Sequence, residues 1–217
     1  MRKVLPCITT TKNTWRQQLK DINRLKIKEV AVFLTMLDYA GRKEFYKKLK
    51  KSTIVSIPHL HIRNDFTPAE IDFFYQNYKT RQFNTHGNYL DNFRANPYFK
   101  KYFSLETTTW FTLEYLKQLN NHYCLDLAHY FSYRVHLIKW NIVKIIDQKI
   151  KQGILPLANH LSGFSKATQD THFASNINYF DYLKRTPKKY LAKIMALELE
   201  NSIPEQLEFI KYIKTLL

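Results

Sequence analysis

Glycine and cysteine are both scarce in this sequence. Its 217 residues include only four glycines and two cysteines, Cys7 and Cys124. The glycines are not clustered, which excludes a dinucleotide-binding fingerprint and a phosphate-binding P-loop, since both need several glycines close together. Two cysteines are too few for a disulfide scaffold or a cysteine-rich zinc finger. The sequence therefore indicates neither a common nucleotide-binding motif nor a small cross-linked domain.

Long apolar runs are also absent. The longest one spans residues 30–37, far short of the roughly 20 residues that a helix needs to cross a bilayer. The polar residues 9–13 interrupt the N-terminal region in which a signal peptide would carry its apolar segment. We therefore expect a cytoplasmic protein with no membrane association and no obligate protein partner.

Acidic residues are few compared with basic ones. The chain has 18 Asp and Glu against 34 Lys and Arg, which gives a formal net charge of +16. An excess of this size favours an anionic partner such as nucleic acid, anionic lipid or a phosphorylated substrate. It is also typical of a chain that is rich in Lys, Asn, Ile and Tyr for compositional reasons. Because the lysines are mostly dispersed, the sequence leaves both interpretations open.

The sequence does contain a regular alternation of short apolar runs and helix-like stretches. Each run has the length of a buried strand. The eight predicted strands are residues 4–9, 29–35, 53–59, 81–86, 102–107, 123–129, 154–160 and 194–200. Eight strands alternating with helices predict a compact (β/α)8 TIM barrel, an α/β fold, as a single domain over residues 1–217. The alternative is an open doubly wound sheet, with one or two of these strands wrongly assigned.

Three of the intervening helices have recognisable boundaries. Thr67-Pro68-Ala69-Glu70 combines an N-cap, a first-turn proline and a carboxylate at the positive end of a helix. Residues 201–205 repeat this pattern, and residues 142–150 form a helix that we expect Gly153 to end. These helices lie between predicted strands or after the last one, as a barrel requires.

Histidines and acids gather where the predicted strands end. They are His59 and His61, His86, Glu106, Asp126 and His129, His160, and Glu198 or Glu200, with Asp170 and His172 in the loop after the seventh strand. In a parallel barrel the carboxyl ends of all strands open on one face, so these side chains are predicted to converge. We prefer Glu198 over Glu200 because of its distance from the following helix.

Converging imidazoles and carboxylates are typical ligands of zinc, manganese or iron(II). Without an ion, several carboxylates at one pore would repel one another and lose hydration. We therefore predict a divalent-metal site. Taken singly, each residue has a plainer interpretation as a hydrogen-bonded polar residue at a strand end. Cys124 lies two residues before Asp126 and is expected to point the same way one layer lower, in the core.

Seven short segments carry a resemblance that runs from the third predicted strand to the eighth. They are Ile57-Pro58-His59, Asn84-Thr85-His86-Gly87, Leu105-Glu106-Thr107-Thr108, Cys124-Leu125-Asp126-Leu127-Ala128-His129, Asn159-His160-Leu161, Asp170-Thr171-His172 and Leu197-Glu198. In this order they resemble the xylose-isomerase-like barrel superfamily, and within it the endonuclease IV family of apurinic/apyrimidinic endonucleases.

The resemblance implies up to three divalent ions, zinc first, with manganese or iron(II) as alternatives. The implied ligands are His59, His86 and Glu106 for one ion, Glu106, Asp126, His160 and Glu198 for the second, and His129, Asp170 and His172 for the third. Glu106 and Glu198 would be catalytic. The implied activity is hydrolysis of DNA phosphodiesters at abasic sites, a DNA-repair reaction.

Three alternatives stay open. A sugar or sugar-phosphate isomerase or epimerase of the same superfamily needs one divalent metal, and the short connections after the second and fourth predicted strands favour it. The run His160-Leu161-Ser162-Gly163 followed by Asp170-Thr171-His172 is similar to a multinuclear iron-dependent oxidase that modifies a peptide. The third alternative is a barrel that has lost activity and serves as a binding protein.

Overall fold

The chain forms a closed barrel of parallel strands. The computed structural model describes residues 2–165, 167 and 169–217. The first strand is split by Pro6 into β1 (Lys3–Leu5) and β2 (Cys7–Thr9). β1 pairs with β11 (Ile194–Leu197) and β2 pairs with β3 (Ala31–Phe33), both parallel. The two halves of one strand therefore join the ends of the sheet and close the ring, which confirms the predicted TIM barrel.

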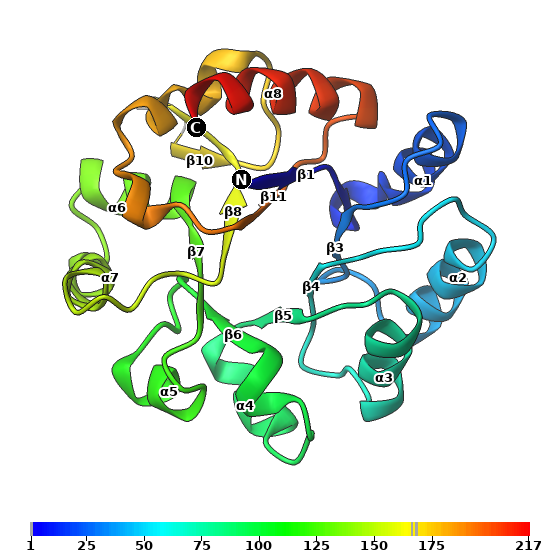
Figure 1. Cartoon of the computed structure of the whole chain (residues 1–217), viewed down its shortest axis with the longest axis horizontal. Helices are drawn as coiled ribbons and strands as arrows, with labels where there is room; N and C mark the ends of the chain where they lie inside the picture. Colours follow the sequence, from blue (N-terminus) through cyan, green and yellow to red (C-terminus); the bar gives the residue numbers. More distant parts are fainter. Residues whose placement is uncertain (1, 166, 168) are drawn as a thin grey trace.

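The remaining strands and the helices follow in alternation (Figure 1). Between β3 and β11 the sheet runs through β4 (His59–His61), β5 (Gln82–Thr85), β6 (Phe103–Glu106), β7 (Tyr123–Asp126) and β8 (Ala158–Leu161). The outer ring comprises α1 (Trp15–Arg24), α2 (Tyr39–Leu49), α3 (Pro68–Asn77), α4 (Phe99–Tyr102), α5 (Leu113–Gln118), α6 (Leu127–Val135), α7 (Trp140–Lys151) and α8 (Ile203–Leu216). Short 3-10 helices are η1 (Thr11–Asn13), η2 (Gly87–Phe93), η3 (Ile177–Arg185) and η4 (Lys188–Tyr190), and β9 (Gly163–Ser165) and β10 (Gln169–Thr171) form a separate antiparallel hairpin.

The predicted helix starts at Thr67 and Ser202 are confirmed, and α7 contains the helix predicted over residues 142–150 but extends beyond it at both ends. Thr67 caps α3 through a complete capping box with Glu70, and Ser202 caps α8 in the same way with Glu205. Such caps satisfy backbone N–H groups that have no partner inside the helix. Gly153 follows α7 with a φ of 80°, a left-handed conformation that glycine adopts without steric cost.

Several predicted strands are displaced or too long. The third was predicted over 53–59, but β4 begins only at His59. Val55 and Ser56 donate backbone hydrogen bonds to the Lys28 carbonyl, Ser56 forms only an isolated parallel bridge with Glu29, and Pro58 has no N–H to offer. The sixth prediction also ran too far, because Asp126 ends β7 and caps α6, so His129 lies on a helix.

The inside of the barrel combines an apolar cluster with a layer of polar side chains. The cluster consists of Leu5, Cys7, Ala31, Phe33 and Ala196, all of them buried. The polar side chains come from β4 to β8 and are also buried. Burying polar groups costs free energy unless they find partners, so this polar layer marks the candidate site. Within the described residues, no helix combines the length and apolarity needed to cross a bilayer.

Candidate metal centre

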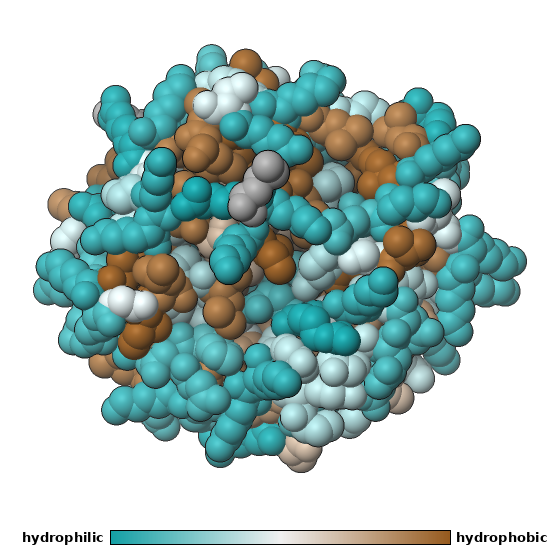
Figure 2. Space-filling view, in the orientation of Figure 1, coloured by the Kyte–Doolittle hydropathy of each residue, from teal (hydrophilic) through white to brown (hydrophobic). Residues whose placement is uncertain are grey.

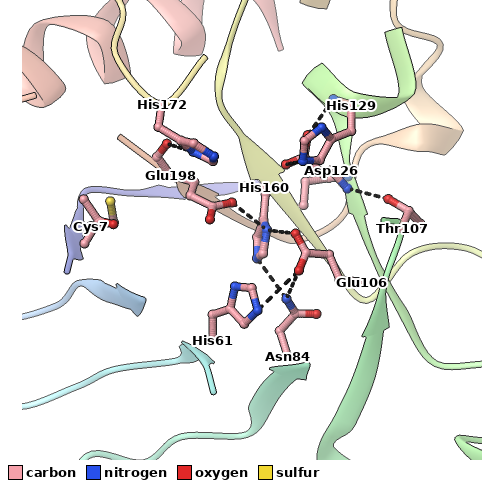
Figure 3. A network of polar contacts seen from close by, with 12 residues as sticks. Cys7, His61, Asn84, Glu106, Thr107, Asp126, His129, His160, His172 and Glu198 are labelled. Atoms are coloured by element: carbon pink, nitrogen blue, oxygen red, sulfur yellow. Dashed lines mark hydrogen bonds and ion pairs between the residues drawn. The ribbon is translucent and has the colours of Figure 1, made fainter. Parts of the chain in front are cut away.

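Glu106, at the end of β6, lies at the centre of the polar layer. Its Oε2 atom is 2.8 Å from His86 Nε2 and 3.3 Å from His61 Nε2. Its Oε1 atom is 3.2 Å from His160 Nδ1. The two oxygens of one carboxylate thus face two different groups of imidazoles, as Figure 3 shows for His61 and His160.

A second group of ligand atoms surrounds Oε1. Glu106, Asp126, His160 and Glu198 each offer one atom within 4.8 Å of the others. His160 Nδ1 lies 3.0 Å from Glu198 Oε2, and the Glu198 side chain is 12% exposed. These four residues come from β6, β7, β8 and the residue after β11. The structure therefore places Glu198 in the site, as preferred from the sequence.

A third group lies on the side of α6 and the β9–β10 hairpin. His129 Nδ1 is 3.1 Å from Asp170 Oδ2, and His129 Nε2 is 3.8 Å from Asp126 Oδ2. His172 Nδ1 lies 3.2 Å from the Glu198 carbonyl, so its ring is held beside the second group. The Asp126 side chain accepts a hydrogen bond from the His129 backbone N–H, and this cap fixes the first turn of α6 next to the site.

The donor atoms fit one or more metal ions. Zinc bonds of about 2.0–2.1 Å in a tetrahedral arrangement separate ligand atoms by about 3.3 Å, close to the spacings around Glu106. His61 Nε2, Asp126 Oδ2 and Glu198 Oε2 are buried atoms that lack a hydrogen bond. Their neighbours lie within ion-pair distance but are not aligned for hydrogen bonding. Lone pairs that converge in this way are what a bound cation requires.

Burial and neighbouring charges shift the pKa values of the first group in opposite directions. Burial raises the pKa of the Glu106 carboxyl, but His61, His160 and His86 together lower it well below its usual range. Burial opposes protonation of His61 and lowers its pKa to about 4. His61 is therefore neutral at physiological pH, which is the state in which imidazole binds metals.

The third group is a charged pair. Burial disfavours the protonated form of His129, yet the carboxylates of Asp126 and Asp170 raise its pKa to about 10. The hydrogen bond from His129 in turn lowers the pKa of Asp170 to about 2. A cation binding here has to displace the His129 proton, because a metal ligand must present a lone pair.

His61, and not His59, lies beside Glu106 and His86, where the resemblance implies a ligand. His59 is fully buried one layer below the mouth, where its Nε2 is 2.9 Å from His160 Nε2. His61 instead contacts Glu106 and lies beside His86, with 5.1 Å between ring centroids. Residues two apart on a strand share a face, so the sequence pattern alone does not choose between the two histidines.

Two positions in the site were not singled out from the sequence. Asn84 Nδ2 lies 3.4 Å from both Glu106 Oε2 and His160 Nε2, and Thr107 Oγ1 accepts a hydrogen bond from the Asp126 N–H. The side chains of β5 alternate between the barrel axis and the surrounding helices. This alternation is the signal that could have identified Asn84 as a residue that faces the axis. Cys124 is buried, as predicted, and burial raises its pKa to about 11.

A cavity of about 430 Å³ opens above these groups. His61, His86, Glu106, His129, His172 and Glu198 line it on the metal-ligand side. Its other walls include the cationic Arg63, the amide of Asn64 and the ring of Tyr89, which stacks on His86. The cavity therefore combines ligand atoms with groups that can bind an anion and a ring.

Comparisons with known proteins do not identify a family for this chain. No protein-family model matches the chain, and no curated protein is similar to it. An uncharacterized B. cereus protein is similar in structure, with a TM-score of 0.48 and 13% identity over 96% of this chain and 64% of that one. The glycerol uptake operon antiterminator regulatory protein from Listeria monocytogenes has a TM-score of 0.46 and 12% identity over 90% and 91%. The chain spans less than two thirds of the B. cereus protein.

Proposed function

We propose that this protein is an enzyme with a multinuclear metal centre at the mouth of its barrel. The observation that carries the proposal is the position of Glu106, whose Oε2 faces His86 and His61 while its Oε1 faces His160. A carboxylate placed in this way is suited to bridge two ions. A site for one ion would not need both sets.

The proposed centre contains three ligand sets. They are His61, His86 and Glu106; Glu106, Asp126, His160 and Glu198; and His129, Asp170 and His172. The first differs from the set that the resemblance implies, since His61 replaces His59. Nitrogen and oxygen ligands suit zinc, and also manganese or iron(II).

The reaction we propose is hydrolysis of a phosphodiester, with abasic DNA as the substrate. When bound, ions of this kind lower the pKa of a coordinated water and neutralise phosphate oxygens. Glu106 and Glu198 orient the ligand sets, while Asp126 and Asp170 hold His129. Arg63 lies at the cavity wall, where it can contact a phosphate, and Tyr89 offers a ring to an exposed sugar. The charge of +16 favours association with DNA.

A nicking assay on a duplex with one abasic site tests this reaction. With zinc present, the wild-type protein is expected to cut beside the lesion and to leave an intact duplex uncut. His129→Ala and Asp170→Ala should each lose activity. Glu198→Gln and Glu200→Gln form a matched pair, of which only Glu198→Gln should lose cutting. A wild-type protein that does not cut with zinc bound would contradict the proposed reaction.

A second reaction has one observation in its favour. The connection from β3 to α2 spans only residues 34–38, and the cavity of about 430 Å³ has the size of a site for a small molecule or a few side chains. A short connection and a cavity of this size suit the alternative of a sugar or sugar-phosphate isomerase or epimerase with one divalent metal. One tightly bound manganese or magnesium ion in the purified protein, together with no nicking, would support this alternative.

A further inference from the structure

A second cluster of ligand atoms lies beneath the mouth of the barrel. His59 from β4, Cys124 from β7 and His160 from β8 are all fully buried. Each offers one atom within 4.8 Å of the others, and the Nε2 atoms of the two histidines are 2.9 Å apart. His59 Nδ1 has no hydrogen-bond partner, so hydrogen bonds do not fully explain why this imidazole is buried.

The cluster differs chemically from the mouth. The three mouth sets hold only nitrogen and oxygen donors, whereas this cluster adds a sulfur atom. The other cysteine, Cys7, is engaged elsewhere, because its Sγ lies 3.6 Å from the Leu199 carbonyl and 3.4 Å from the Leu199 N–H. One thiolate and two imidazoles favour zinc and softer ions over magnesium or calcium.

Several neighbours of the cluster are apolar. The Phe33 ring packs against His59 and His160, with centroid distances of 5.9 and 4.8 Å. Ala158 is paired in register with Cys124 and is also fully buried. A charged group in such a buried place needs nearly complete neutralisation, so the charge of a bound ion has to be matched by its ligands and by the carboxylates that face His160.

We propose that His59, Cys124 and His160 form a buried metal site with a thiolate ligand, beneath the ligand sets at the mouth and sharing only His160 with them. A divalent ion such as zinc would be held by the Cys124 thiolate and by ring nitrogens of His59 and His160, and the carboxylates of Glu106 and Glu198, which face His160 Nδ1, would supply the remaining negative charge. Binding releases to solvent the thiol proton and the proton shared by the two Nε2 atoms. This site does not depend on the proposed reaction at the mouth.

His160 belongs both to the buried cluster and to the second ligand set at the mouth. Its Nδ1 faces Glu106 and Glu198, and its other ring nitrogen points away from them, toward Asn84 (Figure 3). This second nitrogen is also the atom that meets His59. One imidazole can therefore bind an ion on each side, and occupation of the lower site fixes the orientation of a ligand of the upper one.

Cobalt(II) substitution tests the buried site, because bonding of a thiolate to cobalt produces an intense near-ultraviolet absorption that nitrogen and oxygen ligands do not give. The metal-free protein is loaded with cobalt(II) and its spectrum is recorded. The wild type and Cys7→Ser are expected to show this absorption, and Cys124→Ser is expected to lose it. Circular dichroism checks that each variant is folded.

Each other outcome overturns the proposal. If wild-type protein with bound cobalt lacks the thiolate absorption, His59 and Cys124 only pack against His160. If Cys7→Ser loses the absorption and Cys124→Ser keeps it, the wrong cysteine has been assigned. Should Cys124→Ser not fold, His59→Gln provides the test, because it keeps the thiol and should still weaken the absorption severalfold. Failure of the nicking assay would not change the interpretation of these cobalt spectra.

Discussion

At the scale of single residues, the position of each donor atom matters more than its residue type. Glu106 is suited to bridging because both its oxygens lie 2.8–3.3 Å from imidazole nitrogens. His59 and His61 are the same residue type on one strand, yet only His61 reaches this carboxylate. The two histidines should therefore contribute differently to activity.

His61→Ala should reduce the nicking rate by at least about 100-fold, because it removes a proposed metal ligand. Mutation of a residue that only hydrogen-bonds to a ligand already costs about 10–100-fold in metal affinity or activity. His59→Ala should cost no more than about tenfold, since it touches the mouth only through His160. Rates measured with saturating zinc check this order. If His59→Ala reduced the rate more than His61→Ala, His59 and not His61 would belong to the first ligand set.

At the scale of elements, the turn after β5 depends on a residue without a side chain. A Cβ atom on Gly87 would lie 2.2 Å from the Trp110 carbonyl oxygen and 2.6 Å from the Tyr115 ring. The backbone oxygen cannot move aside without shifting the loop after β6. Gly87 therefore allows η2 to pack closely, and this packing holds the preceding His86 at Glu106.

Gly87→Ala should destabilise the fold by about 1–3 kcal/mol, the usual cost of overpacking, and should weaken metal retention through His86. Urea unfolding and metal analysis measure the two effects. Gly41→Ala is the matched control, because the nearest atoms there belong to side chains at 3.2 Å. Equal stability of the wild type and Gly87→Ala would show that the loop after β6 adjusts freely.

A buried ion pair joins α2 to α3. The fully buried Arg42 donates from Nε to Glu70 Oε1 at 2.7 Å, and Tyr46 donates its hydroxyl to the same oxygen at 2.7 Å. Burial raises the pKa of Glu70, but the hydrogen bonds from Arg42, the Thr67 N–H and Tyr46 lower it below its usual value. A lowered pKa in the folded state means that this stabilisation is present above the unfolded pKa of about 4.3 and is lost as the pH falls.

Glu70→Gln should destabilise the fold at pH 7, but by less than the about 3–5 kcal/mol of an unpaired buried charge, because Asp65 still pairs with Arg42. The variant should also lose less stability than the wild type when the pH falls from 6 to 3. Chemical unfolding at several pH values measures both quantities. Parallel pH profiles for the two proteins would show that Glu70 does not contribute to acid sensitivity.

Local sequence signals could predict the elements better than their exact bounds. The capping boxes at Thr67 and Ser202 depend on neighbouring residues, so their helices were predicted correctly. The start of β4 depends on Lys28, a residue distant in sequence that takes the hydrogen bonds of residues 55 and 56. The approximate convergence of the site followed from strand order, whereas the roles of His61 and Asn84 required the register of the barrel.

At the scale of the whole molecule, the barrel brings donors from over a hundred residues of sequence to one mouth, and the surface carries the excess of positive charge. Figure 2 shows hydrophilic residues over most of one face, with hydrophobic ones between them. The sequence left open whether the charge of +16 serves a partner or reflects composition. The two explanations differ in their dependence on salt.

If the charge serves DNA binding, affinity for a duplex should fall by about tenfold or more between 50 and 200 mM salt, as two or more phosphate contacts would cause. Fluorescence anisotropy of a labelled abasic duplex, with cleavage prevented by chelation, provides the measurement. An affinity that does not change with salt would favour the compositional explanation.

The central claim is that Glu106 bridges two ions at the mouth of the barrel. Metal analysis of the purified protein by mass spectrometry, for wild type and Glu106→Gln side by side, tests it most directly. We predict more than one bound ion per wild-type chain and a loss of about two in Glu106→Gln, because both ligand sets share this carboxylate. A wild-type protein without metal, or a variant that retains the full metal content, would contradict the account.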